Sequence, residues 1–177
     1  MPYAVVIYFD KISDQPILNA WRELQENNIS RALHNPGIRP HITLAIYDSL
    51  NCIECEKEIR QYIVNSNLIH LSADHFGIFP LASPVIFIAL TPNRDLINFH
   101  KKIHQILKNN IHGSWEMYQP GNWVPHLTLV RDIKENNLSA ILEICMKIKL
   151  PLELRITQIG IVKFKPVEQL FKIDLEA

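Results

Sequence analysis

A five-residue pattern, Pro-His-[Ile/Leu]-Thr-Leu, occurs twice in this chain. The two copies contain His41 and His126, which are 126 − 41 = 85 residues apart in a chain of 177 residues. A Pro-Gly pair precedes each copy, at residues 36–37 and 120–121. A short motif seen once says little, but a doubled motif with matching flanks at about half the chain length predicts two related structural units.

Each copy of the motif has the alternation of a β-strand. Side chains alternate between the two faces of a strand, so His41 and Thr43 share one face and the aliphatic residues beside them take the other. The second copy places His126 and Thr128 on a common face in the same way. A proline donates no hydrogen bond to a neighbouring strand, which suits the first residue of a strand. Each motif is therefore predicted to pack an apolar face on a core and to present an imidazole and a hydroxyl on the other face.

Hydrophobic periodicity predicts the other elements of the chain. Asp14 is the expected cap of the first helix, with Pro16 in its first turn. Helices are expected at about residues 14–27, 51–64, 93–108 and 134–148, and strands at about residues 3–9, 41–47, 68–79, 85–90, 126–131, 152–164 and 169–175. We expect an α/β fold of the α+β type with two pseudo-symmetric lobes. Each lobe would be a mostly antiparallel sheet with helices on its outer face, and the active-site cleft would lie between the lobes.

Two histidines in one cleft suit acid–base cleavage of a phosphodiester. A histidine pKa of ~6.5 allows one imidazole to be neutral and the other protonated at neutral pH. The neutral ring can accept a proton from the attacking water or hydroxyl, and the protonated ring can give one to the leaving oxygen across the phosphorus. The hydroxyls of Thr43 and Thr128 can donate hydrogen bonds to the non-bridging phosphate oxygens. This scheme requires no metal ion and no other cofactor.

Composition limits the partners and the cellular compartment that we expect for such an activity. The chain has 18 basic and 18 acidic residues, so no strong overall field attracts a polyanion. Three cysteines are an odd number and form no disulfide framework, which favours a reducing cytoplasm. No stretch approaches the ~20 apolar residues that a membrane helix needs. We expect a cytoplasmic monomer with no membrane association and no obligate protein partner.

Two groups of residues have competing interpretations. Trp115, Tyr118 and Trp123 lie in one predicted loop, where they either stack a nucleobase or close the edge of a lobe. His100 and His104 are four residues apart on a predicted helix, which is a spacing used by metal ligands. No glutamate stands in the matching motif position and no third ligand is visible, so an exposed helix face is the favoured interpretation of these two histidines.

The doubled His-x-Thr-Leu pattern resembles that of the 2H phosphoesterase superfamily, which includes the 2′-5′ RNA ligase-like proteins and the cyclic nucleotide phosphodiesterases. The resemblance covers nearly the whole chain in length, motif spacing and element order. It implies a single bilobal domain over residues 1–177. By this resemblance His41 is the proton donor and His126 the proton acceptor, and the two motif threonines hold the phosphate.

The resemblance also adds a candidate after the second motif. RNA ligase-like members often carry an arginine shortly after that motif, and Arg131 stands five residues after His126 here. Alternation puts Arg131 on the face opposite His126, unless the strand bends or ends there. The candidate substrate-binding residues are therefore Thr43, Thr128, Arg131 and Trp123, and no residue is assigned to a metal.

The function implied by the resemblance is metal-independent cleavage of 2′,3′-cyclic phosphates or 2′-5′ linkages in nucleotides or short RNA. One alternative is a binding module that holds RNA ends or nucleotides in the same cleft without turning them over. Another is a metal-dependent hydrolase with His41 and His126 as ligands, against which the absence of carboxylates within either motif argues. The sequence leaves the natural substrate open, and also the choice between hydrolysis and ligation.

Overall fold

The structure is a computed structural model of the chain, and it describes residues 1–29, 38–64, 70–133, 137–164 and 166–175. The Pro-Gly turn predicted at residues 36–37 lies outside the described residues. Of the described helices, none is long and apolar enough to cross a membrane.

The described chain forms strands and helices close to the predicted ranges. The helices are α1 (Lys11–Glu26), α2 (Cys52–Ile63), α3 (Arg94–Leu107), α4 (Leu138–Cys145) and a single 3₁₀ turn, η1 (Glu116–Tyr118). The strands are β1 (Tyr3–Phe9), β2 (His41–Leu50), β3 (His70–Phe79), β4 (Val85–Leu90), β5 (Ile111–Ser114), β6 (His126–Val130), β7 (Leu152–Lys163) and β8 (Glu168–Asp174). The sequence missed β5 and η1, which lie in or beside the segment predicted as a loop.

Side-chain caps determine where three helices begin. Asn51 and Asn93, the predicted starts of their helices, cap α2 and α3 by accepting a hydrogen bond from a backbone N–H of the first turn. The prediction for α1 was wrong. Its cap is Asp10, which accepts from the N–H of Ser13 at 2.8 Å. Asp14 is instead a buried residue inside the helix, with 4% of its surface exposed.

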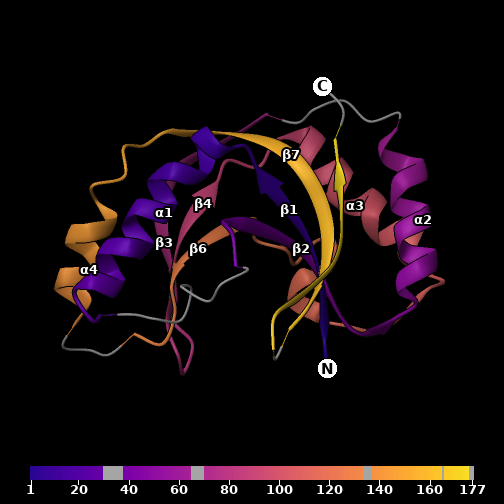
Figure 1. Cartoon of the computed structure of the whole chain (residues 1–177), viewed down its shortest axis with the longest axis horizontal. Coiled ribbons are helices and arrows are strands. Elements are labelled where there is room, and N and C mark those ends of the chain that lie inside the picture. Colours follow the sequence, from indigo (N-terminus) through magenta and orange to yellow (C-terminus); the bar gives the residue numbers. More distant parts are fainter. Residues whose placement is uncertain (30–37, 65–69, 134–136, 165, 176–177) are drawn as a thin grey trace.

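The strands form one continuous sheet in the order β1-β2-β6-β4-β3-β7-β8, and β5 pairs with the outer part of β2. All neighbouring strands are antiparallel. Strand β7 is long enough to pair with β3 through residues 152–155 and with β1 through residues 156–163. Figure 1 shows β7 as an arch that joins the two ends of the molecule.

The order of elements repeats along the chain. One unit is β1-α1-β2-α2-β3 and the other is β4-α3-β6-α4-β7, with β5 and η1 inserted in the second unit and β8 added at its end. In both units the first strand pairs with the motif strand. The third strands are exchanged, because β3 pairs with β4 and β7 pairs with β1. The two halves of the sequence therefore interlock.

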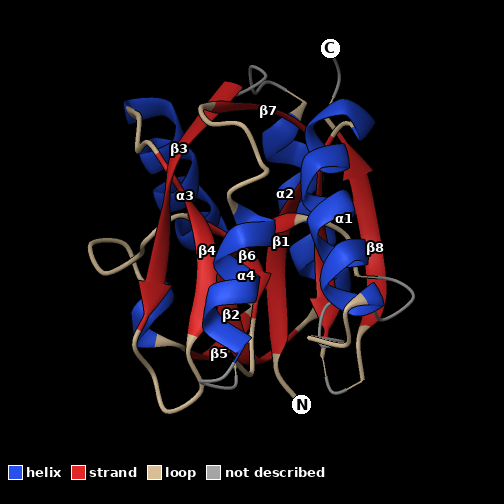
Figure 2. Ribbon diagram, turned by 90° about the vertical axis from the view of Figure 1, so that its left-hand side faces the viewer, coloured by secondary structure: helices blue, strands red, loops and turns tan. Residues whose placement is uncertain are grey.

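The expected two-lobed arrangement is observed only in part. The fold is mixed α/β with an antiparallel sheet and four α-helices in the described residues. Helices α1 and α4 pack together at one end of the molecule, and α2 and α3 pack together at the other (Figure 1). Figure 2 shows α1 and α4 side by side in front of the sheet. The motif strands do not face each other from separate sheets, since β2 and β6 pair directly through Ile42 and Leu127.

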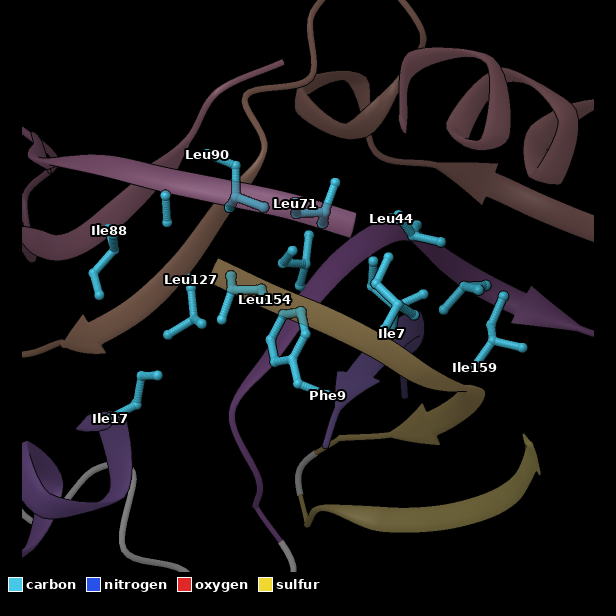
Figure 3. Close-up of a cluster of buried hydrophobic side chains, with 14 of the residues drawn as sticks. Ile7, Phe9, Ile17, Leu44, Leu71, Ile88, Leu90, Leu127, Leu154 and Ile159 are labelled. Carbon is cyan, nitrogen blue, oxygen red and sulfur yellow. The ribbon is translucent and has the colours of Figure 1, made fainter. Parts of the chain in front are cut away.

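The main core lies between the sheet and the helices and contains residues from both repeat units. Figure 3 shows this cluster, in which side chains from β1, β2, β3, β4, β6 and β7 meet beside Ile17 of α1. Leu44 and Leu127, the aliphatic residues of the motif strands, have no exposed surface. Their burial forces the alternate side chains of β2 and β6 onto the opposite face of the sheet.

Candidate active site

The motif histidines and threonines meet on the face of the sheet that is opposite the main core. The two motif strands pair antiparallel through the residue between each histidine and its threonine. Flanking residues of such a pair also face each other, so His41 lies beside Thr128 and His126 lies beside Thr43. The two histidines occupy diagonal positions, whose Cα atoms are ~7–8 Å apart in a sheet. All four side chains line one pocket, as the sequence predicted.

A β-bulge near the end of β6 brings Arg131 into the same pocket. The register between β6 and β4 shifts by one residue after Thr128. Leu129 and Val130 are consequently both buried, with 1% and 0% of their surfaces exposed. The alternation is reversed beyond the bulge, and Arg131 lines the pocket with His126. Simple alternation, which put Arg131 on the opposite face, was wrong at this point.

Strand β2 has the same bulge at the matching position. Its register with β1 shifts by one residue after Thr43, and both Leu44 and Ala45 are fully buried. Ile46 therefore lines the pocket where Arg131 does in the other unit. The two motif strands thus present the same pattern of pocket residues, with an isoleucine in one and an arginine in the other.

Backbone carbonyls fix the orientation of both imidazoles. The Nδ1 atom of His41 lies 2.6 Å from the carbonyl oxygen of Arg39, and Nδ1 of His126 lies 2.7 Å from that of Val124. A carbonyl oxygen only accepts hydrogen bonds, so each Nδ1 carries the proton in the neutral ring. Nε2 is then the nitrogen of each ring that can accept or give a proton in the pocket.

Aromatic side chains surround the two imidazoles. The rings of Phe79 and Phe87 lie edge-on to His126, with centroid distances of 4.9 and 5.3 Å. Tyr8 lies edge-on to His41 at 6.2 Å. These contacts limit rotation of the rings and cover part of their surface. The sequence did not predict a role for Tyr8. It placed this residue in a continuous apolar strand, and such a strand does not show which face of the sheet each side chain takes.

Burial and neighbouring charge depress both histidine pKa values. The pKa of His41 is lowered to about 4, mainly by burial, with smaller contributions from Arg131 and His126 and an opposing one from the hydrogen bond to the Arg39 carbonyl. Burial also lowers the pKa of His126, and Arg131 adds to the effect. These shifts favour the neutral form of both rings at neutral pH. An anion bound between them acts in the opposite direction and favours protonation.

Two arginines line the pocket, and within the described residues one of them, Arg39, is engaged by an acidic residue. The guanidinium of Arg39 donates hydrogen bonds to the Gln158 Oε1, Phe9 carbonyl and Asp14 Oδ2 atoms at 2.8, 2.9 and 3.0 Å. Its central carbon also lies 5.2 Å from the centre of the Tyr8 ring. Arg39 is therefore held in place and its charge is largely balanced.

Arg131 is the available cation of the site. It is exposed, and no ion pair with it occurs among the residues that the structure describes. Its charge lowers the pKa values of both motif histidines. An anionic group bound beside His41 and His126 would therefore find an arginine ready to pair with it.

Trp123 lines the pocket and also holds the backbone of strand β2 through a hydrogen bond. Its indole N–H donates to the carbonyl oxygen of Thr43 at 3.0 Å, and its ring stacks on His100 with a centroid distance of 4.0 Å. His100 in turn donates its Nε2 proton to the carbonyl oxygens of Leu44 and Tyr118 at 2.9 and 3.1 Å. Trp123 lines the pocket with 8% of its surface exposed, so a contact with substrate stays a prediction.

The prediction that His100 and His104 lie on an exposed helix face was wrong. His100 has 2% of its surface exposed, and burial lowers its pKa to about 4. His104 is partly buried and directs Nε2 toward the Leu44 carbonyl at 3.3 Å. Both rings therefore hold the backbone of the β2 bulge. Within the described part of the chain, no group of three or more metal-ligating side chains comes together.

The pocket extends well beyond the four motif side chains. Its volume is about 520 Å³, within the usual range for small-molecule sites. Trp115, Tyr118 and Trp123 all line it, so the loop that the sequence singled out forms one wall. Phe79 and Leu81 of the β3–β4 hairpin lie on its border as well.

The family profile described as the 2′-5′ RNA ligase superfamily matches residues 10–167, which include both motifs and every residue of the site except those of β1. The chain belongs to the 2′-5′ RNA ligase superfamily, the 2H phosphoesterases. The resemblance inferred from the two motifs is thus confirmed.

Two curated relatives of this chain carry the name "Putative phosphoesterase". The one from Oceanobacillus iheyensis is 26% identical over 146 residues, covering 80% of this chain and 77% of that protein. The one from a Geobacillus species is 27% identical over 136 residues, covering 75% and 70%. Both matches extend over most of each partner, which agrees with a shared architecture.

Solved structures establish that the superfamily fold is shared. LigT of Escherichia coli, crystallised with 3′-AMP, superposes with a TM-score of 0.63 at 18% identity and full coverage of both chains. A protein of Thermus thermophilus superposes with a TM-score of 0.59 at 16% identity, covering 99% of this chain and 98% of that one. At these identities the likeness describes the fold, and the chemistry of this chain rests on its own residues.

Proposed function

We propose that this protein is a metal-independent phosphoesterase that cleaves 2′,3′-cyclic phosphates or 2′-5′ phosphodiester linkages of nucleotides or short RNA. The observation that supports this most directly is the diagonal pair of histidines on β2 and β6. Each has Nδ1 bound to a carbonyl, leaving Nε2 for proton transfer, and each has a threonine of the other strand beside it. Such an arrangement suits attack and departure on opposite sides of one phosphorus atom.

The other groups of the pocket have complementary roles in this scheme. The hydroxyls of Thr43 and Thr128 donate hydrogen bonds to the non-bridging oxygens, and Arg131 balances the charge that develops on them. The low pKa values of the histidines make neutral Nε2 available as a base. The phosphate anion raises the pKa of both rings on binding, so that one of them holds the proton that the leaving oxygen requires.

The resemblance to the superfamily assigns the donor role to His41 and the acceptor role to His126, and we keep this assignment as part of the proposal. Because the site is nearly two-fold symmetric, a substrate bound the other way round would exchange the roles. Nucleotides are the natural ligand class to test, since LigT has been crystallised with 3′-AMP, ATP and NADP⁺. The unpaired cysteines Cys52, Cys55 and Cys145 suit a reducing compartment, and we propose that the protein acts in the cytoplasm.

The test is hydrolysis of nucleoside 2′,3′-cyclic monophosphates and of 2′-5′ dinucleotides in the presence of EDTA, by the wild type and by His41→Ala. We expect turnover that survives EDTA and disappears in the variant, whose circular dichroism spectrum matches the wild type. Loss of activity with EDTA and its return with a divalent cation would overturn the metal-independent scheme. Tight nucleotide binding without turnover would instead support the alternative of a binding module.

A further inference from the structure

The two motif histidines differ in what holds the carbonyl group that each of them binds. Arg39 supplies this carbonyl to His41, and its oxygen lies 2.6 Å from Nδ1. Val124 supplies it to His126 at 2.7 Å, but the side chain of Val124 has no polar atom and 46% of the residue is exposed. The start of β6 is held through its backbone instead, because the last N–H of β4 donates to the carbonyl oxygen of Pro125 at 3.2 Å.

The side chain of Arg39 holds the start of β2. Its guanidinium donates to the carboxylate of Asp14 on α1 at 3.0 Å and to the carbonyl oxygen of Phe9 at the end of β1 at 2.9 Å. It also donates to the side-chain oxygen of Gln158 on β7 at 2.8 Å. Asp14 has 4% of its surface exposed, so water competes little with the ion pair. One side chain thus joins the residue that orients His41 to three other elements.

Arg39 also holds the ring that packs on His41. The guanidinium carbon lies 5.2 Å from the centre of the Tyr8 ring, and Tyr8 lies edge-on to His41. The hydroxyl of Tyr8 donates to Oε1 of Gln169 at 2.6 Å, which holds the far end of that ring. His41 is therefore oriented by a hydrogen bond at Nδ1 and by a ring contact, and Arg39 takes part in both.

We propose that Arg39 and Asp14 are positioning residues for His41, because the anchored guanidinium keeps the Arg39 carbonyl on Nδ1 and so leaves Nε2 free for proton transfer. The inference rests on the proposed function for the role of Nε2, and it adds the pair of residues that sets the tautomer of one histidine. The nitrogen of a neutral imidazole that carries the proton is decided by the hydrogen bond made there. His126 does not depend on a charged pair in this way, since Val124 has no side-chain donor.

A direct contact between Arg39 and the substrate is the competing interpretation, because Arg39 lines the pocket. Asp14 separates the two interpretations, since it pairs with Arg39 but is not among the residues that line the pocket. If Arg39 bound the phosphate, removing the charge of Asp14 would leave the guanidinium free and strengthen substrate binding. If Arg39 acts by positioning, the same change loosens the carbonyl and weakens catalysis.

The experiment measures the tautomer of each histidine directly. Protein with ¹⁵N-labelled histidines is studied by two-dimensional NMR at about pH 8, where the lowered pKa values leave both rings neutral. The variants are Arg39→Met, Arg39→Lys and Asp14→Asn, and thermal unfolding verifies that each one folds. Arg22→Met is the matched control, because it makes the same exchange at an exposed position of α1. The spectra of His41→Ala and His126→Ala identify the signals of the two motif histidines.

We expect Nδ1 of His41 to carry the proton in the wild type and the proton to shift toward Nε2 in Arg39→Met and Asp14→Asn. Arg39→Lys, which keeps a cation beside Asp14, should lie between them and the wild type. The His126 signals of the same samples should not change, and Arg22→Met should match the wild type at both rings. With a 2′,3′-cyclic nucleotide, kcat of Arg39→Met should fall by about tenfold to a hundredfold while KM changes less.

Two results would overturn the positioning role. One is an unchanged His41 tautomer in Arg39→Met, and the other is a lower KM with an unchanged kcat in Asp14→Asn. If Arg39→Met does not fold, Arg39→Lys and Asp14→Asn decide the matter by the same measurements.

The NMR measurement requires no turnover, so the two proposals can fail separately. A wild type that cleaves neither cyclic phosphates nor 2′-5′ dinucleotides, but whose His41 tautomer depends on Arg39, would count against the phosphoesterase function and support the positioning of His41. Turnover in the wild type with a His41 tautomer that is independent of Arg39 would support the function and overturn the positioning role.

Discussion

The two motif strands present the same histidine and threonine to the pocket, and they differ at the pocket position beyond the bulge. Strand β2 presents His41 and Thr43 and then, beyond a bulge, Ile46. Strand β6 presents His126 and Thr128 and then, beyond a matching bulge, an arginine. Both histidines bind a carbonyl through Nδ1 at 2.6–2.7 Å. The histidine and threonine positions are therefore the same in both strands, whereas the pocket position beyond the bulge differs.

This difference explains how a nearly symmetric site can bind its substrate in a single orientation. Proton transfer on opposite sides of a phosphorus atom requires a group on each side, which the repeat supplies directly. Discrimination between two orientations of a substrate requires that the ends of the pocket differ in charge or shape. Here Arg131 makes one end cationic, and Ile46, with Val162, makes the other end apolar.

The largest effect should come from removing the shared part of the two strands. His41→Ala and His126→Ala should each lower kcat by ~10²–10⁴-fold, because each removes one partner of an acid–base pair. The double variant should fall little further than either single variant, since the two groups act as a unit. Steady-state kinetics on a 2′,3′-cyclic nucleotide measures this. His112→Ala, which changes an exposed histidine of β5, is the control, and additive losses in the double variant would contradict a paired mechanism.

The next effect should come from the position where the strands differ. Arg131→Met should raise KM for an anionic substrate by ~10–100-fold, because a hydrogen bond to a charged group contributes ~1.5–3 kcal/mol. Ile46→Met, the equivalent change on β2, should alter KM much less. Saturation kinetics of the two variants on one substrate gives the comparison. Equal effects at the two positions would mean that the pocket ends are not distinguished by charge.

The pH dependence should reveal the unequal environments of the histidines. The active pair carries one proton, and with a pKa of about 4 for His41 and a lowered pKa for His126, kcat/KM should be highest between about pH 4 and 6.5. It should fall at higher pH as the last proton leaves, and at lower pH as both rings become protonated. Arg131→Met should move the whole profile to higher pH, because Arg131 lowers both pKa values. A profile of kcat/KM from pH 4 to 9 tests this, and an unmoved profile in the variant would contradict the role of its charge.

The smallest effect should come from removing the hydrogen bond between the Trp123 indole and the Thr43 backbone. Trp123→Phe removes the N–H that donates to the Thr43 carbonyl at 3.0 Å, and should lower the free energy of unfolding by ~0.5–1.5 kcal/mol with a small decrease in kcat. Trp21→Phe is a matched control, because the buried indole N–H of Trp21 has no hydrogen-bond partner among the described residues. Urea unfolding of both variants measures the difference. A larger loss of stability in Trp21→Phe would show that ring packing, not the hydrogen bond, dominates at these sites.

The sequence predicted the local elements of the two strands well. Alternation placed His41 with Thr43 and His126 with Thr128, and the pocket contains all four. The helix starts at Asn51 and Asn93 were also correct, since a capping side chain acts on backbone groups three residues away. The same reasoning failed for α1, because Asp10 and Asp14 are both chemically suitable caps and the tertiary structure buries the second beside Arg39.

The amino-acid sequence by itself therefore determined the repeated motif, the paired histidines and most of the elements that present them, because these depend on neighbouring residues and on a period of two. Only the tertiary structure decided that β2 and β6 pair directly, that a bulge turns Arg131 into the pocket, and that His100 is a buried support of the β2 backbone. Strand pairing and bulges are set by contacts between residues far apart in the chain. The alternation of residues within one strand does not show which register, or which bulge, the neighbouring strand will impose.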